Sequence, residues 1–105
     1  MKYNVIRTET ADEQIREIIL YIAEKFGNEV ALDKLSQLEK GINNLRDNPR
    51  MGIDPHYRLL KRQGFKVLIV EKNLVFYKIN NEQKEIIIYA VVDQRQDYIN
   101  IVRGL

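Results

Sequence analysis

Residues 85–98 read EIIIYAVVDQRQDY, a nearly uninterrupted apolar run followed at once by polar and charged residues. The apolar part, residues 86–92, is rich in β-branched side chains, which favours a central strand buried on both faces. The polar part begins at Asp93 and includes Arg95 and Tyr98. A rigid strand that brings such side chains to the edge of a fold is a common way to build a site. The alternative interpretation is that the chain simply leaves the sheet there.

A helix with one apolar stripe is expected after a short first strand over residues 2–7. Thr8 or Thr10 offers its start, and residues 10–13 fit a capping box, in which a hydroxyl and a carboxylate satisfy free backbone N–H groups. Gly27 is a natural end, because glycine accepts the left-handed conformation that closes a helix. The apolar stripe consists of Ile15, Ile18, Ile19, Ile22 and Phe26.

A second helix should follow directly, with Asn28 as its cap. It should end at Asn48-Pro49, because the residue before a proline avoids helical backbone angles. The short connection between the two helices predicts an antiparallel hairpin. Like the first stripe, the second is expected to cover a sheet, and it consists of Ala31, Leu35, Leu38, Ile42 and Leu45.

The second half of the chain is predicted to form strands joined by short turns, which favours antiparallel pairing. Strands are expected at residues 65–71 and 74–79 around a turn at Lys72-Asn73, and residues 57–60 suit another short strand. Residues 98–105 are expected to form a final turn packed on the sheet. The predicted class is therefore α+β: a strand, an antiparallel helix hairpin, then an antiparallel sheet of roughly three or four strands with a short C-terminal helical turn.

The length and composition narrow the possible functions. The chain has 105 residues, enough for one core, so we expect residues 1–105 to form a single domain. It has no cysteine and one histidine, which excludes disulfides and thiolate metal sites. No metal site and no cofactor are expected. The sequence shows no bilayer-length apolar run and no signal-peptide core, so a cytosolic protein without membrane contact is expected.

Positive charge is concentrated in one segment of the chain. The net charge is only +2, but residues 50–78 carry seven basic residues and two acidic ones. Such a segment would suit a polyanion or an acidic protein partner. A solvated basic face explains the same pattern equally well.

Several short motifs occur in a characteristic order over nearly the whole chain. They are Tyr3 and Val5 before Thr8 and Ala11; Tyr21-Ile22; Ala31, Leu35, Leu38, Ile42, Leu45 and Pro49; Arg58-Leu59, Gly64-Phe65, Asn73 and Phe76-Tyr77; and Val92 with Arg95, Asp97 and Tyr98. Each motif is weak alone, but their order and spacing make the pattern fairly specific. In this pattern the chain resembles the RelE/ParE superfamily of bacterial toxins, the growth-inhibiting halves of type II toxin–antitoxin pairs.

The resemblance implies a cytoplasmic toxin that a small cognate antitoxin holds silent by wrapping around it. Binding of operator DNA by the pair would be a property of the antitoxin. RelE-like members cut messenger RNA on the ribosome, whereas ParE-like members poison DNA gyrase, and one scaffold hosts both activities. The long helix hairpin, with Tyr21-Ile22 and the pattern from Ala31 to Pro49, is nearer the ParE branch.

If the chain is a RelE-like endoribonuclease, a 2′-hydroxyl attacks the adjacent phosphate, which requires proton transfer and cations on the phosphate. Arg95 matches the arginine that RelE-like nucleases carry after the last strand, and it would clamp a phosphate. Tyr98 would stack on a base or hold a proton-transfer position. The candidate catalytic residues for this branch are Arg95, Tyr98, Arg62 and Lys61, and the candidate nucleic-acid or target contacts are Arg58, Lys61, Arg62 and Arg95.

Three observations weaken the nuclease interpretation. Many members have a histidine near the end of the last strand where this chain has Asp93, and a carboxylate repels a phosphate unless a raised pKa makes it a base. His56 has a suitable intrinsic pKa, but it matches no family position and a loop histidine is usually a surface residue. Arg95 also has a structural explanation, an ion pair with Asp97 that anchors the tail.

Gyrase poisoning would need a shaped surface instead of side-chain chemistry, and the resemblance would then imply no enzyme. Candidate surfaces are the sheet end around Arg58 and Arg95 and the turn over residues 98–105. For the antitoxin, an amphipathic helix or strand in an apolar groove is expected. The residues predicted to line that groove are Leu20, Leu32, Val75 and Val102.

A third interpretation is a degenerate toxin or a plain protein-binding module, and the unusual Asp93 keeps it open. Expression without any antitoxin separates the two cases, because a true toxin should arrest growth and a binding module should not.

Overall fold

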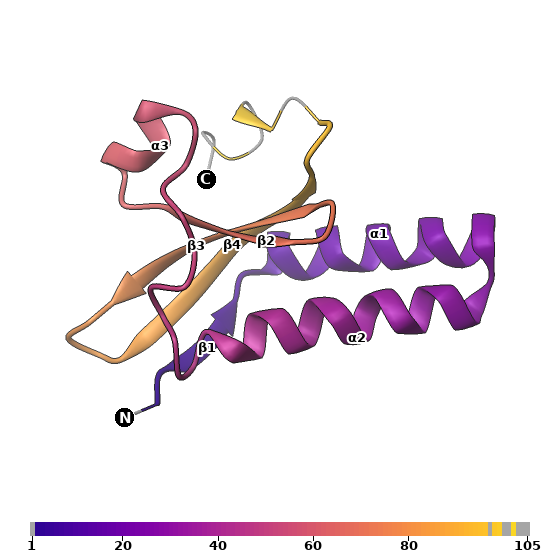
Figure 1. Cartoon of the computed structure of the whole chain (residues 1–105), viewed down its shortest axis with the longest axis horizontal. Coiled ribbons are helices and arrows are strands. Elements are labelled where there is room, and N and C mark those ends of the chain that lie inside the picture. Colours follow the sequence, from indigo (N-terminus) through magenta and orange to yellow (C-terminus); the bar gives the residue numbers. More distant parts are fainter. Residues whose placement is uncertain (1, 97, 100–101, 103–105) are drawn as a thin grey trace.

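The computed structural model describes residues 2–96, 98, 99 and 102, and shows a helix hairpin packed on a twisted sheet (Figure 1). Asp97 and Ile101, which the sequence places in the tail, lie outside the described residues. The described elements, in chain order, are β1 (Asn4–Arg7), α1 (Glu9–Phe26), α2 (Asn28–Asn44), α3 (Arg58–Arg62), β2 (Lys66–Val70), β3 (Asn73–Asn80) and β4 (Glu85–Asp93).

The predicted central strand is confirmed, because β4 lies between β1 and β3 in the order β1-β4-β3-β2. β2, β3 and β4 pair antiparallel, whereas β1 runs parallel to β4. The hairpin of α1 and α2 carries the chain from β1 across one face of the sheet before β2 begins (Figure 1). The α+β class is therefore confirmed. The parallel pairing was not predicted, because it joins segments that are far apart in sequence.

Thr8 begins α1: its backbone is extended, and its hydroxyl accepts a hydrogen bond from the N–H of Ala11 at 3.1 Å. The predicted capping box at Thr10 is wrong, because Thr10 already lies in the first turn of the helix. Gly27 ends α1 with a φ of 97°, as predicted. Gly27 is also the cap of α2, so the predicted capping role of Asn28 is wrong.

α2 ends at Asn44, earlier than the predicted Asn48-Pro49. The last turn tightens there, because the N–H groups of Leu45 and Arg46 bond to carbonyls three residues back. The carbonyl of Arg46 accepts a hydrogen bond from the N–H of Tyr3 at 3.0 Å, so it does not continue the helix. The helix therefore ends at a contact with Tyr3, a residue far away in the sequence, before the chain reaches Pro49.

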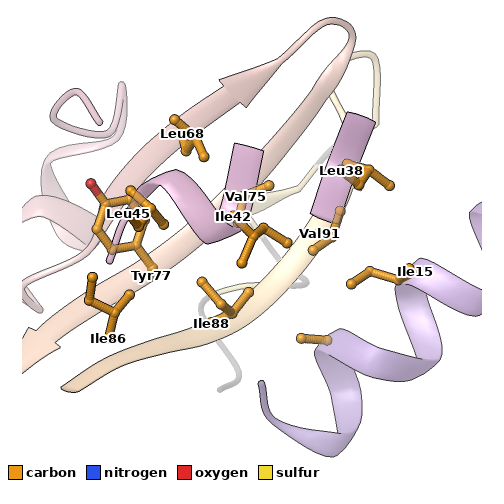
Figure 2. Packing of buried hydrophobic residues seen from close by; sticks show 11 residues of the cluster. Ile15, Leu38, Ile42, Leu45, Leu68, Val75, Tyr77, Ile86, Ile88 and Val91 are labelled. Carbon is orange, nitrogen blue, oxygen red and sulfur yellow. The ribbon is translucent and has the colours of Figure 1, made fainter. Parts of the chain in front are cut away.

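The larger core lies between the hairpin and the sheet (Figure 2). Ile15 of α1 and Leu38 and Ile42 of α2 face Ile88 and Val91 of β4, and all are buried. Both predicted apolar stripes therefore contribute side chains to this core where the helices lie over the sheet. The hairpin extends past the sheet, however (Figure 1), so its tip is uncovered and Phe26 is 66% exposed. The predicted burial of Phe26 is therefore wrong.

A second core covers the opposite face of the sheet and includes Leu60, Phe65, Phe76, Ala90, Val92 and Val102. Residues 57–60 are not a strand as predicted; Arg58–Arg62 form the short helix α3. These residues are leucine, lysine and arginine, which favour helices, and only Leu60 among them is buried. Ile99 and Val102 are helical, and the N–H of Val102 bonds to the carbonyl of Tyr98, in agreement with the predicted C-terminal turn.

A bulge in β4 determines how the strand reaches its polar end. Phe76 pairs with Ala90 but Tyr77 pairs with Ile88, so Tyr89 is an extra residue. β1 pairs only with the first half of β4, up to Ile88. Beyond the bulge α1 takes over that edge: the Thr8 hydroxyl donates to the carbonyl of Tyr89, and the side-chain carbonyl of Gln14 accepts from the N–H of Val91 at 2.8 Å.

The β2–β3 turn is Glu71-Lys72, one residue earlier than predicted, and Asn73 is the first residue of β3. Glu71 takes the positive φ of 54° that the tight connection requires. In the part of the chain that the structure describes, no helix has both the length and the apolar composition needed to cross a bilayer.

Candidate functional site

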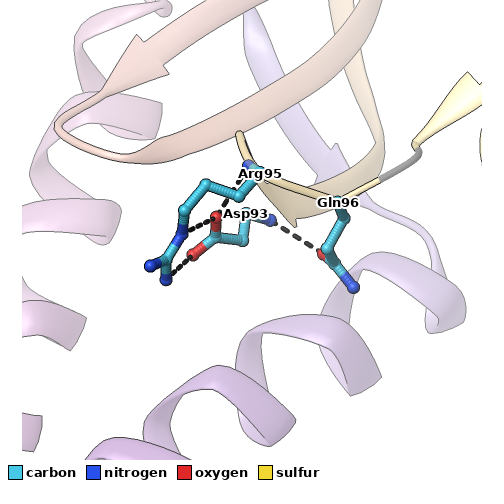
Figure 3. A network of polar contacts seen from close by, with 3 residues as sticks. All are labelled: Asp93, Arg95 and Gln96. Carbon is cyan, nitrogen blue, oxygen red and sulfur yellow. Dashed lines mark hydrogen bonds and ion pairs between the residues drawn. The ribbon is translucent and has the colours of Figure 1, made fainter.

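The turn after β4 closes on itself (Figure 3). One carboxylate oxygen of Asp93 accepts from the backbone N–H of Arg95 at 2.8 Å and from Arg95 Nε at 3.0 Å, and the other accepts from Nη2 at 3.1 Å. Gln96 Oε1 accepts from the N–H of Asp93 at 2.9 Å. The N–H of Gln94 bonds to the carbonyl of Lys72, which fastens the turn to the β2–β3 connection. The polar cluster is therefore an ordered turn.

The pair of Asp93 and Arg95 is electrostatically matched. The Arg95 side-chain hydrogen bond holds the pKa of the Asp93 carboxyl below its usual range, and Lys34 of α2 adds a smaller effect in the same direction. The Asp93 bond in turn raises the pKa of Arg95. The Arg95 side chain is 78% exposed, so solvent screens much of this interaction. The geometry nevertheless directs two N–H groups of the guanidinium at a carboxylate of the same turn.

A groove of about 1030 Å³ lies between this turn and α1; we call it the β4 groove. Its α1 wall has an apolar part with Ile18, Tyr21 and Phe26, of which Tyr21 and Phe26 are 58% and 66% exposed, and an acidic part with Glu13 and Glu17. The opposite wall carries Lys72 and Arg95. Reasoning from sequence missed this groove, because a stripe at helical spacing does not reveal where the sheet beneath it ends.

Tyr98 lies on the other face of the sheet. Its ring is 5.2 Å from that of Phe76 and 5.5 Å from that of Tyr57, which directly precedes α3. Partial burial is the main cause that raises its pKa, and Tyr57 adds to the effect. Tyr98 is therefore placed with α3, whereas Arg95 lines the β4 groove beside α1. The structure does not bring the predicted catalytic set together.

Three of the four basic residues predicted as target contacts, Arg58, Lys61 and Arg62, are exposed on α3, whereas the fourth, Arg95, lines the β4 groove. Lys61 pairs with Asp54 at 3.4 Å, and Lys66 pairs with the same carboxylate at 3.6 Å. The helix is thus joined to the start of β2 through Asp54. This acidic partner was missed, because nothing in the sequence pattern connects Asp54 to Lys61.

The predicted antitoxin residues separate into two groups. Leu20 and Leu32 are 62% and 63% exposed on the hairpin. Val75 and Val102 are fully buried in the two cores, so in this structure they do not line a surface. Val75 is inaccessible because helices cover one face of β3, and Val102 because its helical turn packs on the opposite face. His56 is an exposed loop residue whose ring meets the edge of Tyr57.

Two adjoining hollows, of about 730 and 380 Å³, follow the hairpin on the β1 side and share Arg7, Leu35 and Glu39; we call them the hairpin groove. Leu20 lines one hollow and Leu32 the other. Arg46 also lines the groove, and its Nε is buried without a hydrogen-bond partner in the described part of the chain.

Comparison with known proteins places these features in a family context. Residues 5–98 match the family described as the ParE toxin of the type II toxin–antitoxin system parDE. No curated protein matches the sequence.

Three solved structures share the fold at low identity. The chromosomal ParDE system of P. aeruginosa is 18% identical with a TM-score of 0.72, over 88% of this chain and 96% of that one. The RelBE2 toxin–antitoxin complex of Mycobacterium tuberculosis is 19% identical with a TM-score of 0.60, over 89% and 99%. A mutant of the E. coli toxin RelE in its free state is 16% identical with a TM-score of 0.64, over 97% and 94%.

Proposed function

This chain belongs to the ParE toxin family of type II toxin–antitoxin systems, and from that membership we propose that it acts in the bacterial cytoplasm and arrests growth by poisoning DNA gyrase. In this role the toxin carries no reactive side chain and acts by holding its target in one state. A cognate antitoxin neutralises it, and operator DNA is bound only through that antitoxin.

The observation that carries the proposal is the internal pairing of Arg95. In a RelE-like nuclease the arginine at this position would direct its N–H groups at the scissile phosphate, because charge develops there in the transition state. In this chain Nε and Nη2 of Arg95 already bond to Asp93. A phosphate would have to displace that carboxylate or lie beside its negative charge. This arrangement favours a structural role for Arg95 in its own turn over catalysis, and so supports the gyrase branch.

The proposed site for the antitoxin is the hairpin groove. Leu20 and Leu32 expose apolar surface that an amphipathic antitoxin segment would bury. Arg46 lines the same groove, so its charge would suit an acidic residue of that segment. Val75 and Val102 are no longer part of the proposed contact set, because both are buried.

A RelE-like endoribonuclease is the second candidate, and one specific contact favours it. Tyr98 and Tyr57 meet edge to face at 5.5 Å beside the start of α3, which carries Arg58, Lys61 and Arg62. Aromatic rings next to cations are a common platform for unpaired bases. In that case Tyr98 would position a base, and Lys61 and Arg62 would neutralise phosphates.

The deciding experiment uses the purified chain without antitoxin in two assays, gyrase supercoiling with detection of trapped cleaved DNA, and mRNA cutting on programmed ribosomes. Trapped DNA with intact mRNA supports the proposal, and Arg95→Ala should then leave poisoning within about twofold. Cut mRNA with normal gyrase overturns it, and Arg95→Ala should then abolish cutting. If the chain does not arrest growth when expressed alone, it is a binding module.

A further inference from the structure

A second exposed apolar surface lies at the edge of the sheet opposite β1. Ile53 forms an isolated antiparallel bridge with Val67 of β2, with N–O distances of 2.8 and 2.9 Å. Because outward-facing groups alternate along an antiparallel strand, the N–H and C=O of Ile69 point to the same edge. Ile53 and Ile69 are 56% and 52% exposed. They are diagonal neighbours across the bridge, so their side chains form one apolar patch.

Basic side chains lie beside this patch. Asp54, which directly follows Ile53, pairs with Lys61 of α3 and Lys66 of β2, so the basic helix is linked to the segment that carries the patch. Neither Arg58 nor Arg62 has an ion pair within the described part of the chain, and both are exposed. The cations therefore outnumber the single carboxylate, and the surface carries net positive charge. We call this region, formed by Ile53, Ile69, Asp54, Arg58, Lys61 and Arg62, the β2-edge surface.

We propose that the β2-edge surface is where this toxin holds its target protein, and that it fits an acidic protein face with an apolar centre. This inference rests on the proposed function, because it names the contact through which poisoning occurs. Apolar residues at the centre with arginines around them are typical of the energetically dominant part of protein interfaces. Steering by the basic residues would speed encounter with an acidic partner.

The chemistry favours a protein over a nucleic acid as the occupant. Two exposed isoleucines offer area that a protein partner would bury but that a phosphate backbone would not contact. Asp54 lies among the cations and repels phosphates, whereas a protein partner can place a basic or polar group next to it.

The β2-edge surface and the hairpin groove are at opposite edges of the sheet, since β1 and β2 are its two outer strands. Substitutions at one surface should therefore leave binding at the other unchanged. This separation makes the inference testable with antitoxin binding as an internal reference.

The test uses two variants of the full chain, Ile69→Asp and the double charge reversal Arg58→Glu with Arg62→Glu. Both alter exposed side chains, so the thermal midpoint should stay close to that of the wild type. Val30→Asp, at an exposed apolar position of α2, is the match for the first variant, and Lys25→Glu, on the exposed end of α1, is the match for the second. Each is expressed without antitoxin to score growth arrest, and assayed for gyrase poisoning and antitoxin affinity.

We expect both surface variants to lose growth arrest and to weaken gyrase poisoning at least about tenfold, with antitoxin affinity unchanged. The two matched variants should behave like the wild type. Growth arrest that survives both surface variants overturns the inference, whatever the target is. Loss of antitoxin affinity in both also overturns it, because the surface would then belong to the antitoxin.

The two proposals fail in distinguishable ways. If the wild type arrests growth without affecting gyrase and both variants lose that arrest, the gyrase proposal fails while the surface stands with another protein target. If the variants lose mRNA cutting instead, the occupant is RNA and the inference is wrong. A wild type that never arrests growth refutes both proposals.

Discussion

The hydroxyl of Tyr77 holds the loop between α2 and α3 against the sheet. It donates to the carbonyl of Pro49 at 2.8 Å and accepts from the N–H of Gly52 at 3.0 Å. The ring itself is fully buried in the larger core. One side chain thus connects the sheet to the loop that carries Ile53, and through it to the β2-edge surface.

Gly52→Ala should destabilise the protein, because there is no room for a side chain at this position. A Cβ would lie 2.5 Å from the Tyr77 hydroxyl and 2.7 Å from the backbone oxygen of Val67. We expect a loss of about 1–3 kcal/mol in the free energy of unfolding, measured by chemical denaturation. In a Tyr77→Phe background the cost should be smaller, since the hydroxyl clash is gone. An equal cost in both backgrounds would locate the strain elsewhere.

The stability of the protein should depend on Tyr77 at alkaline pH. Burial raises the pKa of this tyrosine, so the folded state keeps the phenol proton at a pH where the unfolded state has lost it. The stabilisation is fully present below the ordinary pKa of about 10 and is lost as the pH rises through the folded value. The wild type should therefore lose more stability than Tyr77→Phe between about pH 9 and pH 11. Parallel pH profiles of the two proteins would contradict this.

At the scale of elements, the end of β4 depends on α1. β1 leaves the outer edge of β4 at Ile88, and the backbone N–H groups on that edge beyond Ile88 have no strand to pair with. The side-chain oxygen of Gln14 accepts a hydrogen bond from the N–H of Val91, and that of Gln96 accepts one from the N–H of Asp93. Two glutamine side chains therefore supply the hydrogen-bond acceptors that a neighbouring strand would otherwise supply. These bonds attach both α1 and the turn at Arg95 to β4, on the two sides of the β4 groove.

Gln14→Ala should cost about 1–2 kcal/mol of unfolding free energy, because it leaves the N–H of the buried Val91 without a partner. Gln37→Ala is the matched control, since Gln37 is exposed on α2 and alanine favours a helix. Its stability should be unchanged or slightly higher. Hydrogen exchange of the Val91 amide should also accelerate in Gln14→Ala alone. If the two variants are equally stable, the Gln14 contact contributes nothing.

At the scale of the whole molecule, the hairpin is longer than the sheet it covers (Figure 1). Its inner part supplies Ile15, Leu38 and Ile42 to the core, while Leu20 and Leu32 stay exposed above the hairpin groove. Exposed apolar residues of this kind contribute little to the stability of the free chain and are available to a partner. The inner part of the hairpin thus stabilises the fold, while the exposed leucines along it are available to bind a partner.

Leu20→Asp or Leu32→Asp should weaken antitoxin binding at least about tenfold with little change in thermal midpoint, as measured by calorimetry. Val75→Ala should do the reverse: about 2 kcal/mol of stability is lost from the core, while binding by the folded protein persists. Gln37→Asp is an exposed control on α2 for the added charge. Normal antitoxin affinity in both leucine variants would place the antitoxin on another surface.

Local patterns in the sequence were sufficient for the central strand, the two amphipathic helices, Gly27 as a helix end and the α+β class. Each of these depends on residues within one or two turns or one strand, and periodicity and backbone preference act at that range. The order of motifs also indicated the toxin superfamily. Local signals misplaced element ends where a distant contact competes, as at Arg46, whose carbonyl bonds to Tyr3.

Only the tertiary structure decided how the candidate residues are grouped. Arg95 and Tyr98 are three positions apart in the sequence, yet Arg95 lines the β4 groove beside α1 and Tyr98 packs against Phe76 on the other face of the sheet. Leu20 and Val75 have the same apolar character, but one is exposed and the other is buried. Exposure and proximity depend on which elements pack together, and packing is set by contacts between residues far apart in the chain.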